Sequence, residues 1–555
     1  MPARRSAAFS RFPLKNLFCS ILLIVVAVSS AWAQDSPPTP SAPAQGSQPF
    51  PAPAAQQPPA AASPSSPPPP GPEQQNSKQQ EVPGTGISVQ KQQPSPAQSG
   101  AAQQEQPSAA AGPITKQQEK ELFRSVNQIL RFASDDTGLP IQHSVKRKLI
   151  TRQAVSSYVE ERMREDKDTQ RLQRSQAILI KFGLLPPNYD LASEYLRLLR
   201  EQVAAYYDAK TQTVNLLDWV PPDQQKPVLA HELTHALQDQ KVGLEKWQLA
   251  GGKEDKPLPD NQEEVVEEAQ SAREAVAEGQ AMIVFIDYSL APLGLDVLKA
   301  PDMVDAMRSG MGDTSDSPLF AAAPIYLRES LLMPYTFGAD FIRYVLEHKG
   351  KYAAFAGTLD RPPVDTRQIM QPETYLANEV VAPLQVPDLD KLVGPGYERY
   401  DFGGMGEFDV YLLLKQYAPD KDAKDFYSHW RGGYYLAVHA KGAPKDQVAL
   451  LYRSRWDTAE AAQSFATVYE KYVPNRYPQW SQDENRSTTG VDSGQVSKWQ
   501  EGPESAAVQV LQDKNDLLIL EGFDQATAER LSVALLQRGS VDANAPSAGH
   551  MSTPH

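Results

Sequence analysis

Apolar residues recur at helical spacing through the first part of the chain that has the composition of a folded protein. Between residues 116 and 132 they fall on one face of a helix, and similar patterns predict helices over 145–167, 169–182 and 190–207. Gly183 and the pair Pro186-Pro187 separate the last two. This region is therefore predicted to be mainly helical.

The pattern changes after residue 212. Residues 213–217 are short, apolar and rich in β-formers, which predicts a strand, and Pro221-Pro222 ends it before a helix that runs from about 223 to 240. A polar loop over 243–261 leads to a strongly acidic helix over 263–288. Shorter helices are predicted over 300–350.

The last third of the chain mixes both periodicities. Prolines mark 358–395 as a loop. Beyond it we expect helices over 407–416, 459–472 and 525–538, paired strands over 434–440 and 448–452, and a hairpin of 507–511 with 517–520. The predicted fold class is α+β and mainly helical, with a small C-terminal hairpin and helix unit.

The N-terminus predicts export. Four basic residues precede an apolar run from Leu17 to Val28, and Ala31-Trp32-Ala33 supplies small residues at a cleavage position. We interpret 1–33 as a signal peptide; an uncleaved anchor is the alternative. The apolar run is short for a spanning helix, so no stable membrane span is expected after cleavage. Because Cys19 is the one cysteine of the chain, the mature protein would have neither disulfides nor thiolate ligands.

Composition defines the remaining boundaries. Residues 34–115 hold 20 of the 48 prolines and one aromatic residue, Phe50, so this segment is predicted to be disordered. Its polyproline character suits a semi-rigid arm that contacts a cell wall. We expect a main domain over 116–480, a small α/β extension over 481–540 and a disordered tail over 541–555. A net charge of −14 without a basic cluster argues against nucleic acid as a partner.

The clearest chemical signal is His231-Glu232-Leu233-Thr234-His235 within the helix predicted from 223. Residues i and i+4 share a helix face, so both imidazoles can reach one Zn²⁺, with Glu232 beside it as the general base. The uncharged residues that surround the motif indicate a buried helix. An exposed helix with two solvent-facing histidines is the alternative.

A catalytic zinc needs a third protein ligand and one open position. The metzincin pattern is excluded, because Gln238 and Lys241 stand where it places glycine and histidine. The acidic helix offers Glu274 and Glu278 on one face. The alternative is that both merely solvate that face, as Glu263, Glu264, Glu267 and Glu268 would.

On these residues the sequence resembles the gluzincin zinc metallopeptidases. Their third ligand is a downstream glutamate that often opens a Glu-Gly-x-Ala motif, as Glu278-Gly279-Gln280-Ala281 does. The resemblance implies a zincin-like core with Glu278 as a zinc ligand and Glu274 as an outer partner of a histidine. In other members the spacing of the two acids makes Glu274 the ligand, and this choice stays open.

The chain also resembles a group of exported bacterial proteins that share this motif order and have no assigned substrate. The resemblance covers most of residues 118–475. It is carried by the string from His231 to Gln240 together with segments 201–208, 363–375, 406–407 and 456–457.

The predicted activity is hydrolysis of peptide bonds with one Zn²⁺ per chain. The metal activates a water, Glu232 accepts the water's proton and passes it to the leaving amine, and the substrate is a peptide or protein. Tyr288, Tyr335 and Tyr375 are the kind of residue that serves as an oxyanion donor, but core packing is the favoured role for each and none is selected as the donor. The strand at 213–217 is expected to be an edge that aligns an extended peptide. The alternatives are a non-catalytic zinc protein with a fourth ligand, and an envelope binding or scaffold protein with a degenerate motif.

Overall fold

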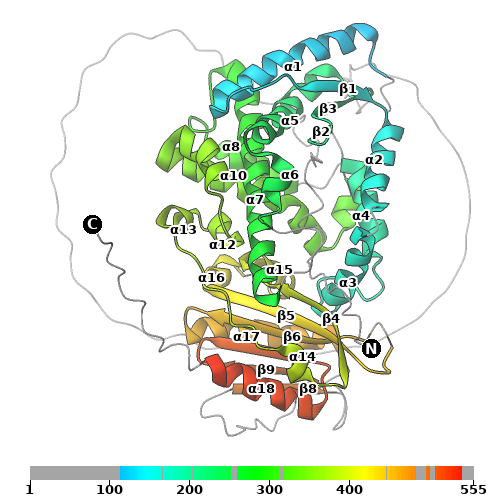
Figure 1. Cartoon of the computed structure of the whole chain (residues 1–555), viewed down its shortest axis with the longest axis vertical. Coiled ribbons are helices and arrows are strands. Elements are labelled where there is room, and N and C mark those ends of the chain that lie inside the picture. The colour runs from blue at the N-terminus through cyan, green and yellow to red at the C-terminus, as the bar shows by residue number, and fades with distance from the viewer. Residues whose placement is uncertain are drawn as a thin grey trace, which may run out of the picture. The chain divides into compact units, whose positions relative to one another are not determined.

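The computed structural model describes residues 113–164, 167–202, 205–251, 259–312, 317–419, 421–444, 447–479, 481–482, 495–500 and 507–539. The fold is α+β and mainly helical, as predicted. Figure 1 shows the long helices on one side and a seven-stranded sheet with α17 (Ala459–Arg476) and α18 (Gln525–Gly539) on the other. The predicted signal peptide, arm and tail lie outside the described residues, apart from residues 113–115 of the arm. No described helix is both long and apolar enough to cross a bilayer.

Three long helices form the centre of the helical part. They are α5 (Pro222–Val242), α7 (Asp260–Leu290) and α10 (Ile325–Tyr352), and α1 (Lys116–Thr137) packs along α5. Both α5 and α7 begin after a proline, and Gly243 ends α5 in the left-handed conformation at φ 65°. The predicted helices over 223–240 and 263–288 are confirmed.

Helices α7 and α10 touch through two glycines. A Cβ atom on Gly279 would lie 2.2 Å from the carbonyl oxygen of Gly338, and one on Gly338 would lie 2.2 Å from the carbonyl oxygen of Ala275. Any side chain at either position would push the helices apart, since interiors of this density do not absorb such an overlap. The glycine pair therefore sets how closely α10 approaches the middle of α7.

A three-stranded sheet lies next to α5 in the order β1-β3-β2. Strand β3 (Thr213–Leu217) is confirmed, but it pairs with β1 (Lys146–Ile150) on one side and with β2 (Tyr206–Asp208) on the other. The expectation that β3 is an edge strand is therefore wrong. The side-chain amide of Gln225 also bonds both the N–H and the C=O of Leu217, the last residue of β3, so the backbone groups of this residue are occupied as well.

Two helix predictions fail at this sheet. Residues 146–150 form β1 rather than the start of a helix, and α2 begins only at Arg152 (Arg152–Arg164). Helix α4 (Leu191–Gln202) ends before residue 206, where β2 begins. Both strands exist because β3 pairs with them. The partner of β1 lies more than 60 residues away, and β2 is only three residues long, so neither strand has a local periodicity that the sequence would reveal.

The other helices of this part connect and cover the central three. Loop 358–395 contains short helical turns rather than loop alone, since α11, α12, α13 and α14 lie within it. The bounds are α3 (Lys167–Lys181), α6 (Leu244–Gln248), α8 (Asp302–Gly312), α9 (Pro318–Ala322), the π-helical turn η4 (Ala353–Gly357), α11 (Thr358–Asp360), α12 (Thr366–Met370), α13 (Pro372–Ala377) and α14 (Leu389–Val393).

The C-terminal part is an antiparallel sheet in the order β4-β5-β6-β10-β9-β8-β7. The predicted strand pair and hairpin are confirmed, and β10 pairs with β6, so the predicted boundary at residue 480 runs through one sheet. The bounds are β4 (Tyr397–Gly404), β5 (Trp430–Ala440), β6 (Ala449–Trp456), β7 (Ser481–Gln482), β8 (Gln495–Gln500), β9 (Ala507–Asp513) and β10 (Asp516–Glu521), with α15 (Glu407–Tyr417) and α16 (Lys424–Tyr427) between strands.

The acidic first half of α7 is buried, not solvated. Its glutamates are 5–8% exposed, and two of them bond neighbouring backbone. Glu267 accepts the N–H of Gly404 at the end of β4, and Glu268 accepts both the N–H and the hydroxyl of Thr366. The alternative that this helix presents an acidic face to solvent is therefore wrong, and α7 joins the helical part to the sheet.

A carboxyl pair links the C-terminal ends of α1 and α7. Burial raises the pKa of Asp287, and the neighbouring Asp136 raises it further. Burial likewise raises the pKa of Asp136, although Lys351 opposes this. The folded protein therefore binds protons more tightly here than the unfolded chain does. This contribution to stability is lost progressively as the pH rises from about 4, the pKa of an unperturbed carboxyl, through the folded-state pKa of Asp287 at about 7.

We expect Asp287→Asn to stabilise the protein at pH 8 by about 1–2 kcal/mol and to have little effect at about pH 3, below the pKa of the carboxyl in the unfolded chain. The asparagine oxygen still accepts the N–H of Val297, as Oδ1 of Asp287 does. Urea unfolding at several pH values measures the difference, with Asp302→Asn on the exposed face of α8 as the control. A variant that is less stable than the parent at pH 8 contradicts the assignment.

Candidate metal centre

The two histidines lie on the buried face of α5. Residues 228–238 are all buried, and the exposed fractions of His231 and His235 are 0% and 2%. Their Nε2 atoms are 3.0 Å apart. The alternative of an exposed helix with two solvent-facing histidines is therefore excluded, and the predicted i, i+4 pair points to a common position.

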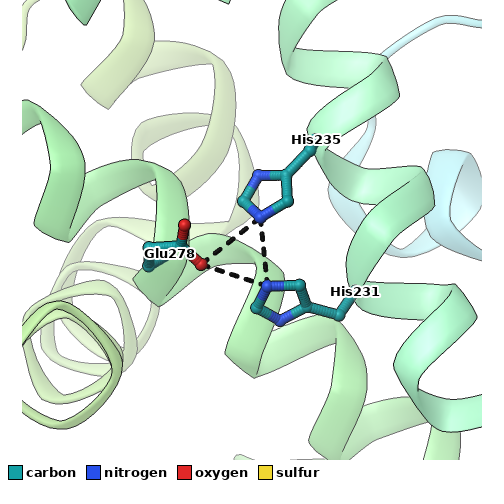
Figure 2. Close-up of side chains that lie close together, drawn as sticks. All are labelled: His231, His235 and Glu278. Carbon is teal, nitrogen blue, oxygen red and sulfur yellow. Dashed lines mark hydrogen bonds and ion pairs between the residues drawn. The ribbon is translucent and has the colours of Figure 1, made fainter. Parts of the chain in front are cut away.

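Glu278 on α7 completes a triangle. Its Oε2 lies 3.1 Å from Nε2 of His231 and 3.3 Å from Nε2 of His235, and its exposed fraction is 2%. Figure 2 shows the two rings from α5 and the carboxylate from α7 converging on one point. These three residues are the group that can hold a metal ion within the described part of the chain.

The triangle has the dimensions of a zinc site. Ligand atoms about 2.1 Å from a tetrahedral Zn²⁺ lie about 3.4 Å from one another, only slightly more than the three distances here. Protons alone satisfy this arrangement poorly, because three mutually close acceptor atoms compete for them, whereas a central cation satisfies all three. Two imidazoles and one carboxylate are also a donor set that zinc prefers.

The three residues would leave one position of a tetrahedral metal ion without a protein ligand. No fourth His, Cys, Asp or Glu joins the triangle among the residues that the structure describes. A tetrahedral ion would therefore keep one position for a water or a substrate atom.

Electrostatics also favour a cation. Burial opposes the charge of Glu278, yet the adjacent histidines, His235 foremost, outweigh burial and lower the pKa of this carboxyl. Burial lowers the pKa of His231 to about 4, so this imidazole is neutral at physiological pH. At His235 burial is outweighed by Glu278, which raises its pKa. The carboxylate thus holds positive charge in a buried site.

Glu232 lies beside the ligands without joining them. Its Oε2 accepts the backbone N–H of Tyr207 in β2 at 2.6 Å, and within the described residues Oε1 has no hydrogen-bond partner. Burial raises the pKa of Glu232 to about 8, since the side chain is fully enclosed. Strand β2 thus fixes one oxygen, and the other is available to exchange a proton.

Each residue of the second motif has a physical role. Glu278 contacts both histidines, Gly279 permits the contact with α10, and the amide of Gln280 bonds backbone carbonyls near η4. Ala281 is fully buried. Glu274, one turn earlier, is 6% exposed, and the group that could hold a metal ion contains Glu278 rather than Glu274.

Sequence reasoning overlooked three contributors. Nδ1 of His235, the nitrogen that faces away from Glu278, is hydrogen-bonded to Gln238. From the sequence alone, Gln238 served only to exclude the metzincin pattern. Gln280 bonds Gln238, and Tyr207 bonds Glu232. The spacing of Gln238, three residues after His235 on the same helix, is the signal that could have identified it.

The three candidate tyrosines lie in different places. Tyr335 stacks against His231, with ring centroids 6.2 Å apart. Tyr375 donates its hydroxyl to the carbonyl of Arg361 and packs against Phe341, while Tyr288 packs against Phe132. Of the three, Tyr335 is the one in contact with a ligand residue.

We expect Glu278→Gln to lose zinc and Glu274→Gln to keep about one zinc per chain, because a neutral amide is a poor replacement for a ligating carboxylate. Elemental mass spectrometry of the dialysed proteins measures the content. The reverse result, with zinc retained in Glu278→Gln and lost in Glu274→Gln, would make Glu274 the ligand.

Comparison with known proteins identifies one region. A model for a domain of unknown function (DUF8575) matches residues 397–532, which cover β4–β10, α15–α17 and part of α18. All the residues of the metal centre lie outside this match. No curated protein and no solved structure matches the chain.

Proposed function

We propose that this protein is an exported zinc-dependent hydrolase of peptide bonds, of the gluzincin type, with one Zn²⁺ per chain. The observation that carries the proposal is the buried triangle of His231, His235 and Glu278, with the unpaired oxygen of Glu232 nearby. The short sheet beside α5 agrees with a zincin-like core. The resemblance to the gluzincins supports a peptide or protein as the substrate, and the N-terminal sequence pattern supports export.

A zinc ion held by these ligands supplies a Lewis acid that polarises a carbonyl and lowers the pKa of a water towards 7. Glu232 is the group that takes the proton from the attacking water and gives it to the leaving amine. The N–H of Tyr207 holds the carboxylate in place through Oε2, so that Oε1 exchanges the proton. Tyr335 is the nearest of the candidate donors for the oxyanion.

One feature favours a structural zinc as the second candidate function. The ligand side chains are at most 3% exposed, so a polypeptide reaches them only if the surrounding segments open. A structural zinc needs no such opening. It would, however, leave Glu232 without a chemical role and one coordination position without a protein ligand.

Glu232→Gln separates the two functions. The amide still accepts the N–H of Tyr207, so we expect about one zinc per chain and a loss of hydrolysis by a factor of about 10²–10⁴. Cleavage of a broad peptide library, followed by mass spectrometry, gives the rate, and His235→Ala is the control without zinc. A zinc-loaded parent that cleaves nothing in the library favours the structural zinc. Equal rates in parent and variant exclude Glu232 as the base.

A further inference from the structure

His235 is held from its outer side by a buried glutamine. Its Nδ1 lies 2.9 Å from Oε1 of Gln238, and both residues are at most 2% exposed. A neutral imidazole has one N–H and one lone pair, so the partner of Nδ1 decides which nitrogen is free for a metal. If Oε1 accepts from Nδ1, then the lone pair is on Nε2, the atom that faces Glu278.

The amide of Gln238 has only one orientation that satisfies its neighbours. Its Nε2 lies 2.9 Å from the carbonyl oxygen of Ala277 and 2.9 Å from Oε1 of Gln280. A backbone carbonyl can only accept, so the nitrogen must face Ala277 and the oxygen must face His235. The flipped amide would bring two oxygens together at a fully buried position and leave both without a donor, which is unfavourable.

The amide of Gln280 is fixed in the same way. Its Nε2 lies 3.0 Å and 2.9 Å from the carbonyl oxygens of Ala354 and Phe355 in η4, and 2.8 Å from the hydroxyl oxygen of Thr358. That hydroxyl donates its own hydrogen to Ala354 at 2.7 Å, so it accepts from Gln280. Oε1 of Gln280 must therefore face Gln238.

These contacts form a chain of hydrogen bonds with a single polarity. We propose that Gln238 and Gln280 are positioning residues that transmit this polarity from the carbonyls of η4 to His235, placing the proton on Nδ1 and the lone pair of Nε2 towards Glu278. The inference rests on the metal centre of the proposed function and goes beyond its ligands. In this arrangement the backbone carbonyls of the π-helical turn η4 anchor one end of the chain of hydrogen bonds.

Two substitutions at Gln238 distinguish positioning from packing. Gln238→Glu keeps an oxygen for the N–H of His235 but loses the donor to Ala277, so the fold should be less stable. Gln238→Met fills a similar volume and removes the acceptor. A packing role predicts that methionine is tolerated at least as well as glutamate, whereas a positioning role predicts that glutamate preserves zinc binding better.

The first experiment measures zinc affinity of the full chain by competition with a chromogenic chelator. We expect Gln238→Met to weaken the affinity 10–100-fold, Gln280→Met to weaken it less, and Gln238→Glu to stay within a few-fold of the parent. Gln225→Met is the matched control, because Gln225 is a buried glutamine of α5 that bonds Leu217 and Val220 instead. It should lower stability and leave zinc affinity unchanged. An unchanged affinity in Gln238→Met, or a weaker one in Gln238→Glu than in Gln238→Met, overturns the proposal.

The second experiment observes the proton itself. In the zinc-loaded protein with ¹⁵N-labelled histidine, the Nδ1–H of His235 should give a slowly exchanging NMR signal that His235→Ala removes. The signal should persist in Gln238→Glu and exchange rapidly in Gln238→Met. A signal that is unaffected in Gln238→Met contradicts the proposed chain of hydrogen bonds. Neither experiment uses hydrolysis, so a parent that binds zinc without cleaving peptides rejects the proposed function alone, and a parent that binds no zinc rejects both.

Discussion

The contact between Glu278 and the two histidines is the constraint on which the central packing depends. A carboxylate and two imidazoles leave water entirely here, and such groups are costly to bury unless they find partners or a cation. The geometry gives each ligand atom two neighbours within 3.3 Å. Helices α5 and α7 must therefore be in contact at the level of these three residues. A shift of either helix along its axis would leave a buried charge uncompensated.

The close packing of α10 follows from this constraint. Because α5 occupies one face of α7 at Glu278, α10 packs against another, and the pair Gly279 and Gly338 brings its backbone near the site. The same approach places Tyr335 against His231 and the carbonyls of η4 within reach of Gln280. The glycine that follows the ligand thus contributes to the metal centre through packing rather than through a chemical group.

Local periodicity predicted the parts of the site that lie on single helices. His231, Glu232 and His235 follow from one i, i+4 motif. The acidic helix offered Glu274 and Glu278 on one face, and the resemblance to the gluzincins pointed to Glu278. The choice of Glu278 over Glu274 required the structure, since both occupy the same helix face and only the packing of α7 on α5 separates them. Strand β1 was mistaken for helix because its pairing with β3 is long-range, whereas β2 pairs locally with β3 and was missed because it is only three residues long and follows a helix closely. The role of Gln280 was not predicted because its hydrogen-bond partners come from three separate elements.

Helix α7 physically connects the metal centre with the region that matches the domain of unknown function. The match to a domain of unknown function begins at residue 397, more than 100 residues after the last ligand, so it carries no information about the chemistry. Yet Glu267 bonds the end of β4 within the match, and Glu278 lies three turns further along the same helix. A helix transmits displacement along its axis almost rigidly, and close-packed interiors convey strain. The buried glutamates of α7 that face the sheet therefore fix the position of the third ligand as well as the docking of the C-terminal domain, which explains why that half of the helix is acidic without being exposed.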